Sequence, residues 1–114
     1  MISDAPFIYK LPQNQSVAEP LTAMFNCSAT GHPRPTLTWQ MFRNGVYTTI
    51  SQSNKYSITN IPVGEQNQTS TLTIYNTSPQ DSAQYECNAM NILGSIESST
   101  MATLSVLGKS NTSV

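Results

Sequence analysis

Two cysteines and a single tryptophan constrain the fold of this chain more than any other feature. Cys27, Trp39 and Cys87 each fall on the apolar side of a segment in which apolar and polar residues alternate, which is the pattern of a half-buried β-strand. Two sheets about 10 Å apart can be joined by one disulfide with a large flat side chain packed on it. We therefore expect a Cys27–Cys87 disulfide covered by Trp39, with two free buried thiols as the alternative.

Other segments alternate in the same way and define the expected strands. Five segments are expected to form strands, and the residues on their apolar sides are, in order, Leu21, Ala23, Phe25, Cys27 and Ala29; Leu37, Trp39 and Met41; Leu72 and Ile74; Ala83, Tyr85, Cys87 and Ala89; and Ala102, Leu104 and Val106. Weaker strands are expected at Tyr56–Ile58 and around 46–50. A first strand over 7–11 and 15–19 would be broken at Pro12, because proline cannot donate to a sheet ladder. The pattern predicts an all-β chain.

Turn residues separate these segments at short intervals. The sequence predicts a stiff loop at 31–35, a tight turn at Asn44–Gly45 and a short hairpin connection at Asn91–Gly94. Residues 78–82 fit a single helical turn, and no helical period extends further. The regular spacing of turns favours a sandwich of many short strands.

The length of 114 residues suits one domain and is too short for two. We assign residues 1–5 to an artificial start or linker, 6–107 to the domain and 108–114 to a polar tail or linker. No apolar run approaches the roughly 20 residues that cross a bilayer, and no signal-peptide pattern occurs. We expect an excised piece of a longer protein that does not itself insert into a membrane.

The charge pattern argues against nucleic acid as a partner. The net charge is −1, and the five Lys and Arg residues are scattered along the chain, so no basic stripe can neutralise a row of phosphates. Only 10% of residues are charged, and Ser, Thr, Asn and Gln supply the polar surface. Such a surface is more usual outside the cell, so we expect an extracellular location.

The sequence offers no catalytic or metal-binding constellation. His32 is the only histidine and lies in the proline-rich loop, where we expect it to be solvent-exposed. A zinc site needs three or four convergent ligands, and the carboxylates form no calcium-type cluster. We interpret Asp81 as a structural acid and Glu86 and Glu97 as solvated strand residues. We expect no enzyme activity, no cofactor and no metal.

Two motifs carry a resemblance to a known family. Cys27-Ser-Ala-Thr-Gly31-His-Pro33-Arg-Pro35-Thr-Leu-Thr-Trp39 and Asp81-Ser-Ala-Gln-Tyr85-Glu-Cys87-Asn-Ala-Met-Asn91-Ile-Leu-Gly94 resemble the two halves of an intermediate-set (I-set) immunoglobulin domain. The resemblance covers about residues 6–107. It implies a Greek-key sandwich of two antiparallel sheets. It also implies a tyrosine corner, in which the Tyr85 hydroxyl bonds back to the chain near Asp81, while Asp81 accepts backbone donors and pairs with Lys55.

Within this family, the final strand region is similar to domains of neural adhesion molecules and receptor-type tyrosine phosphatases. The resemblance implies a module of a cell-surface adhesion molecule or receptor. Its partner would be another protein, a second copy of itself included, together with adjacent domains of the same chain. The alternatives are a spacer domain of an intracellular muscle-type giant protein and a secreted immune recognition domain. Residues 46–50 lack the lysines of heparin-binding relatives, so no glycosaminoglycan site is expected.

Five Asn-x-Ser/Thr sequons are candidate glycosylation sites: Asn14, Asn26, Asn67, Asn76 and Asn111. The resemblance places the first four on the sheet that contains Cys27 and Leu72, or on its rims, and Asn111 in the tail. Glycans there would shield that sheet and leave the other bare. Cys27 inside the second sequon and Pro79 after the fourth are expected to reduce their use.

The bare sheet is the expected partner surface. Alternation gives it the outward residues Gln40, Phe42, Gln84, Glu86, Asn88, Met90, Met101 and Thr103. Of these, Phe42, Met90 and Met101 are more apolar than a solvent-facing strand needs, and exposed apolar groups can mark a protein contact. The alternative is that they pack under loops or are scattered singly. Ile92 and Leu93, at the tip of the last hairpin, form a second candidate contact for a partner or an adjacent domain.

Overall fold

A computed structural model describes residues 3–97 and 101–108 of the chain, and the side chain of Glu97 is not described. The elements are β1 (Asp4–Lys10), β2 (Gln15–Ala18), β3 (Ala23–His32), β4 (Thr36–Arg43), β5 (Val46–Thr49), β6 (Tyr56–Val63), β7 (Asn67–Ile74), η1 (Pro79–Asp81), β8 (Ala83–Asn91), β9 (Gly94–Glu97) and β10 (Ala102–Leu107). Within the described part of the chain, no helix is long and apolar enough to cross a bilayer.

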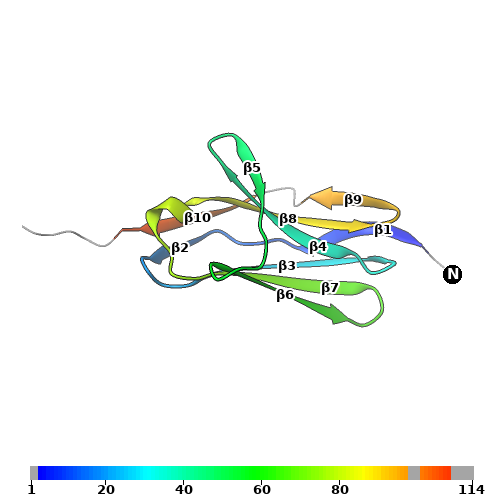
Figure 1. Ribbon diagram of the computed structural model, residues 1–114. Coiled ribbons are helices and arrows are strands. Elements are labelled where there is room, and N and C mark those ends of the chain that lie inside the picture. The colour runs from blue at the N-terminus through cyan, green and yellow to red at the C-terminus, as the bar shows by residue number, and fades with distance from the viewer. Residues whose placement is uncertain (1–2, 98–100, 109–114) are drawn as a thin grey trace, which may run out of the picture.

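The strands form two packed sheets (Figure 1). The first sheet has the order β1-β3-β7-β6, and the second has the order β2-β10-β8-β4-β5, with β9 paired to β8 beside that path. β2 pairs with β10 in parallel, whereas β3, β4 and β8 pair with their neighbours in antiparallel. The predicted two-sheet β-sandwich is confirmed.

The core lies between the sheets around the predicted disulfide. Cys27 of β3 and Cys87 of β8 are joined, with their Cα atoms 6.4 Å apart, so the alternative of two free thiols does not hold. Trp39 is fully buried beside them, directly opposite Cys87 in the register of β4 and β8. Its indole N–H donates a hydrogen bond of 2.9 Å to the buried Ser70 hydroxyl on β7. This bond satisfies a polar group that would be costly to bury unpaired.

The first strand is divided between the two sheets. β1 pairs with β3 in the first sheet, and β2 pairs with β10 in the second. The break contains Pro12, as predicted, because a residue without an N–H interrupts the ladder there. β1 already begins at Asp4, so Asp4 and Ala5, placed in the starting segment by the sequence analysis, belong to the strand.

Two boundaries differ from the expectation. Leu21 is 61% exposed, and β3 begins only at Ala23, so Leu21 lies in the preceding turn and outside the inward row. β6 continues to Val63, beyond the expected end at Ile58. The apolar alternation stops earlier because β6 is an edge strand whose later residues are exposed. Pro62 is tolerated at such an edge.

Candidate protein-contact surface

The predicted partner residues lie on the outer face of the second sheet. The strand pairing within this sheet shows the position of each residue along its strand. Phe42 of β4 stands opposite Tyr47 of β5, and their rings pack with centroids 4.6 Å apart. Phe42 is therefore half-buried, which corrects its assignment as a freely exposed anchor. The Asn44–Gly45 turn joins the two strands with positive φ at both residues, as a two-residue hairpin turn requires.

Phe42 and Met90 do not form one patch. In the β4–β8 register, Met90 lies opposite Thr36 and Phe42 lies opposite Gln84. Six residues of strand thus separate the two levels, which is roughly 20 Å at the usual rise of about 3.4 Å per residue. The alternation places both side chains on one face, but the strand length keeps them apart. The predicted anchors Phe42 and Met90 therefore lie at separate places on this face.

The centre of this face is polar. Glu86 is only 4% exposed, so the interpretation of this residue as a solvated strand residue was wrong. It stands opposite Gln40 on β4, in the middle of the sheet, where neighbouring strands cover it from both sides. Met101, just before β10, is half-buried and is not a free anchor either.

The most exposed apolar group of this sheet lies at the β8–β9 hairpin. Met90 is 54% exposed, Ile92 88% and Leu93 47%. Met90 ends the outward row of β8, and Ile92 and Leu93 form the turn between the two strands. We call these three residues the hairpin group.

The hairpin is held by one side chain that the sequence analysis did not single out. The Asn91 carboxamide nitrogen donates to the carbonyl of Asp4 at 2.8 Å and to that of Pro33 at 2.9 Å. Its oxygen accepts the Leu93 N–H at 2.9 Å. Gly31 leaves room for this amide, because a Cβ there would approach the Asn91 nitrogen to 3.2 Å. The hairpin is thus fastened to β1 and to the β3–β4 loop.

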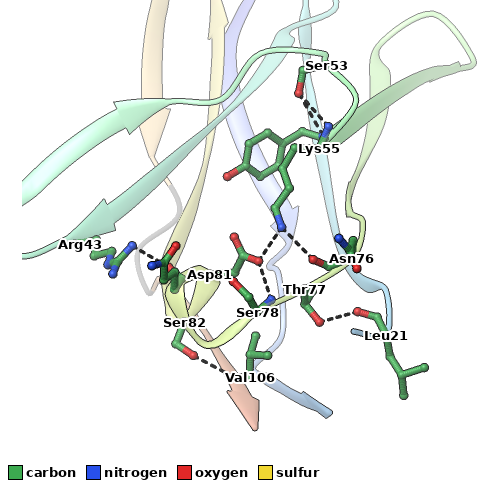
Figure 2. Close-up of polar contacts among 12 residues, drawn as sticks. Leu21, Arg43, Ser53, Lys55, Asn76, Thr77, Ser78, Asp81, Ser82 and Val106 are labelled. Carbon is green, nitrogen blue, oxygen red and sulfur yellow. Dashed lines mark hydrogen bonds and ion pairs between the residues drawn. The ribbon is translucent and has the colours of Figure 1, made fainter. Parts of the chain in front are cut away.

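The predicted tyrosine corner lies at the other end of the second sheet and is confirmed. The Tyr85 hydroxyl donates to the Asp81 carbonyl at 2.7 Å. The Asp81 carboxylate accepts the Ser78 N–H at 2.9 Å and pairs with the Lys55 ammonium at 2.7 Å (Figure 2). Lys55 also donates to the Asn76 carbonyl at 3.1 Å. This network fastens η1 to the start of β6, so its role is structural.

Burial controls the ionisation of the tyrosines near this corner. Desolvation, with smaller contributions from Tyr56 and Asp81, raises the pKa of the Tyr85 phenol well above its ordinary value, and Arg43 opposes the effect. Desolvation and then the charge of Asp81 raise the pKa of Tyr56 as well. Both phenols therefore stay neutral at physiological pH and remain available as hydrogen-bond donors.

His32 does not lie where it was expected. It is the last residue of β3 and is half-buried, and its Nδ1 atom is buried without a partner within the described structure. Among the described residues, no three His, Cys, Asp or Glu side chains converge as metal ligands.

The sequon asparagines lie on several parts of the sandwich. Asn26 is on β3, Asn67 begins β7 and Asn76 follows β7, as expected for the first sheet and its rim. Asn14 lies at the break between β1 and β2, as expected, and its oxygen accepts the Thr103 N–H of β10 in the second sheet at 2.8 Å. Asn111 lies outside the described residues.

Comparison with known families agrees with this geometry. Residues 6–106 match the model of the immunoglobulin I-set domain. The chain belongs to this family. Members of the family are non-catalytic modules, and the resemblance seen in the two cysteine motifs is confirmed. The I-set match covers both sheets and the disulfide, so the whole described sandwich is one I-set domain.

Similar proteins are much longer than this I-set domain. It is 34% identical over 94 residues to WAP, Kazal, immunoglobulin, Kunitz and NTR domain-containing protein 2 of Mus musculus, covering 79% of this chain and 15% of that protein. It is 34% identical over 110 residues to inactive tyrosine-protein kinase 7 of Mus musculus, covering 96% of this chain and 9% of that protein. The I-set domain thus spans only a small part of these relatives.

Two solved structures are similar to the I-set domain. The tandem Ig repeats of Dlar share 33% sequence identity with it at a TM-score of 0.76, covering 93% of this chain and 50% of that chain. A chimeric titin Z1Z2 shares 27% identity at a TM-score of 0.76, covering 96% of this chain and all of that chain.

Proposed function

We propose that this I-set domain is an extracellular module of a cell-surface adhesion molecule or receptor, and that it binds another protein through the hairpin group. The paired cysteines support the location, because structural disulfides persist in oxidising compartments and are rare in the cytosol. The domain offers a protein-binding surface rather than chemistry, and recognition needs no cofactor.

The hairpin group carries the proposal. Met90, Ile92 and Leu93 expose apolar surface at one end of a rigid sandwich. The three hydrogen bonds of Asn91 hold the tip in one arrangement. A contact that is already ordered before binding loses less conformational entropy when the partner arrives. Loops on a rigid scaffold are common binding elements for this reason.

The Phe42–Tyr47 pair supports a weaker, second contact. Val46 and Tyr47 of β5 are 59% and 48% exposed, and β5 is the edge of its sheet. In Figure 1, β5 stands away from the body of the sandwich. Its distance from the hairpin group means that a partner contacting both would have to cover the polar centre of the sheet.

A spacer role in a tandem array is the second candidate function. β1 begins at one end of the sandwich and β10 finishes at the opposite end (Figure 1), which suits domains strung in a line. The similar Dlar structure contains tandem Ig repeats. In that case the hairpin group, which lies at the end where β1 begins, would pack against the preceding domain.

Two measurements test the proposal. Thiol alkylation and mass spectrometry of the native protein should find Cys27 and Cys87 joined; reduced cysteines would favour the intracellular spacer. The secreted domain, displayed multivalently, should bind cells that present the partner or a second copy of itself. Replacing Ile92 and Leu93 by Ser should lower that binding by about tenfold or more, as loss of a central apolar contact does.

The matched control replaces Ile61 and Val63 by Ser. These residues are 54% and 48% exposed and lie on the opposite sheet, so this change also removes exposed apolar side chains but leaves the hairpin group intact. Equal binding by the two variants would rule out the hairpin group as the contact. If the Ile92 and Leu93 variant lost binding only when a preceding domain is attached, the result would favour the spacer role.

A further inference from the structure

A hollow of about 240 Å³ opens where the chain leaves β1 and crosses to β2. It is lined by Lys10, Leu11, Gln13, Asn14, Gln15, Met24, Phe25 and Asn26. β1 pairs only with the second half of β3, so the edge of β3 at Met24 has no strand beside it on this side. The Gln15 side chain takes that place by donating to the Met24 carbonyl and accepting the Met24 N–H. The lining thus combines the fixed polar side chain of Gln15 with the apolar residues Leu11, Met24 and Phe25.

Two of the sequon asparagines, Asn14 and Asn26, line this hollow. The Asn14 side chain is oriented by one hydrogen bond, since its oxygen accepts the Thr103 N–H at 2.8 Å. That bond uses only the carboxamide oxygen and leaves the nitrogen, which is the atom that N-glycosylation modifies. Asn14 lies in a loop, and both Asn14 and Ser16 of its sequon are exposed.

The competing sequon at Asn26 is less suited to modification. Asn26 lies within β3 opposite Thr71 of β7, and its carboxamide oxygen accepts the Thr71 hydroxyl at 2.7 Å. Its Ser28 is 4% exposed and shares a hydrogen bond of 2.9 Å with Thr69. Cys27, between Asn26 and Ser28, is disulfide-bonded to Cys87. Asn26 itself is exposed, but folding buries the Ser28 hydroxyl that this sequon requires.

We propose that Asn14 is N-glycosylated and that the first N-acetylglucosamine of its glycan seats in this hollow and covers Met24. The bond forms between the Asn14 amide nitrogen and the anomeric carbon of the sugar. A lipid pyrophosphate-linked oligosaccharide is the donor; its sugar–phosphate bond breaks, the lipid pyrophosphate leaves and the amide nitrogen loses one proton. The apolar side of the ring would contact Met24, and its polar groups would reach Lys10, Gln13 and Gln15. The inference rests on the extracellular location proposed above.

The test uses the chain secreted from mammalian cells, with glycopeptide mapping followed by timed oxidation with hydrogen peroxide. We expect Asn14 to be occupied and Asn26 bare. Methionine oxidation follows exposure, so we expect a seated glycan to slow oxidation of Met24 by about threefold or more. Met90 is the internal control, because it is 54% exposed against 52% for Met24 and lies on the other sheet.

Ser16→Ala is the matched variant, since it removes the sequon and keeps Asn14 with its bond to Thr103. Ser16→Thr keeps the sequon and should keep the protection of Met24. A secreted chain with Asn14 bare, or with Asn26 occupied in its place, would overturn the inference. So would equal oxidation of Met24 in the glycosylated and Ser16→Ala proteins. The glycan results do not depend on the cysteine alkylation or on the hairpin variants. Failure of the glycan proposal can therefore be distinguished from failure of the proposed function.

Discussion

The Tyr85 hydroxyl donates a 2.7 Å hydrogen bond to the carbonyl of Asp81, four residues earlier in the chain. Tyr85 is completely buried and its ring stacks on Phe25 with centroids 5.1 Å apart. Asp81 in turn joins η1 to β6 through Lys55. One phenol therefore connects the aromatic core to the turn that leads into β8, and the stability of the I-set domain should depend on it.

Tyr85→Phe should destabilise the domain by about 1–2 kcal/mol, because it keeps the ring in the core but removes the donor to a buried carbonyl. Urea unfolding followed by Trp39 fluorescence measures this. Tyr75→Phe is the control, since Tyr75 is 43% exposed and should change stability by less than about 0.5 kcal/mol. Equal midpoints for the two variants would show that the corner contributes nothing.

Stability should fall as the pH rises above about 10. Burial raises the pKa of Tyr85 and of Tyr56 in the folded domain, whereas an unfolded chain releases these protons near pH 10. Above that pH the unfolded state binds fewer protons than the folded state, so the free energy of unfolding decreases with pH. The stabilisation from the two neutral phenols is fully present below about pH 10 and is lost as the pH rises toward their pKa values in the folded domain.

Two readouts test this pH dependence. Absorbance of tyrosinate at 295 nm should show a late-titrating group that Tyr85→Phe removes. Unfolding free energies measured from pH 8 to pH 11 should fall less steeply for Tyr85→Phe than for the native sequence. Identical slopes would mean that Tyr85 does not account for the alkaline loss of stability.

Asp81→Ala should cost more than Lys55→Ala. Asp81 is 7% exposed and accepts both the Ser78 N–H and the Lys55 ammonium, whereas the Lys55 side chain is 34% exposed and can regain water. We expect a loss of about 2 kcal/mol for Asp81→Ala and about 1 kcal/mol or less for Lys55→Ala. A double-mutant cycle isolates the pair, and a larger loss for the lysine variant would contradict this ranking.

The disulfide was predictable because Cys27, Trp39 and Cys87 each lie on the apolar side of an alternating segment, although the two cysteines are 60 residues apart. The corner was predicted from the family resemblance of the segment that holds Asp81 and Tyr85. The contact surface was harder to predict. Alternation tells which face a residue occupies but not its level along the strand, so Phe42 and Met90 were grouped although the register separates them.

Long-range contacts explain the remaining differences. Asn91 reaches Asp4 across 87 residues, and no local pattern marks such a bond. Glu86 looked like a solvated residue because burial on the outer face depends on neighbouring strands. The Phe42–Tyr47 contact could have been found, since a two-residue turn at Asn44–Gly45 places positions 42 and 47 opposite each other.

Asn91→Ala should loosen the hairpin group and destabilise the domain by about 2 kcal/mol, because two carbonyls and one N–H lose their partner together. Asn91→Asp is the informative companion, since its carboxylate can still accept the Leu93 N–H but cannot donate to the carbonyls of Asp4 and Pro33. Hydrogen exchange at the Leu93 amide should therefore accelerate strongly in Asn91→Ala and less in Asn91→Asp. Both variants should lose the anchorage of β1, since neither can donate to the carbonyls of Asp4 and Pro33. Unchanged exchange at Leu93 in Asn91→Ala would mean that the strand pairing of β8 and β9, rather than the asparagine, holds the tip in place.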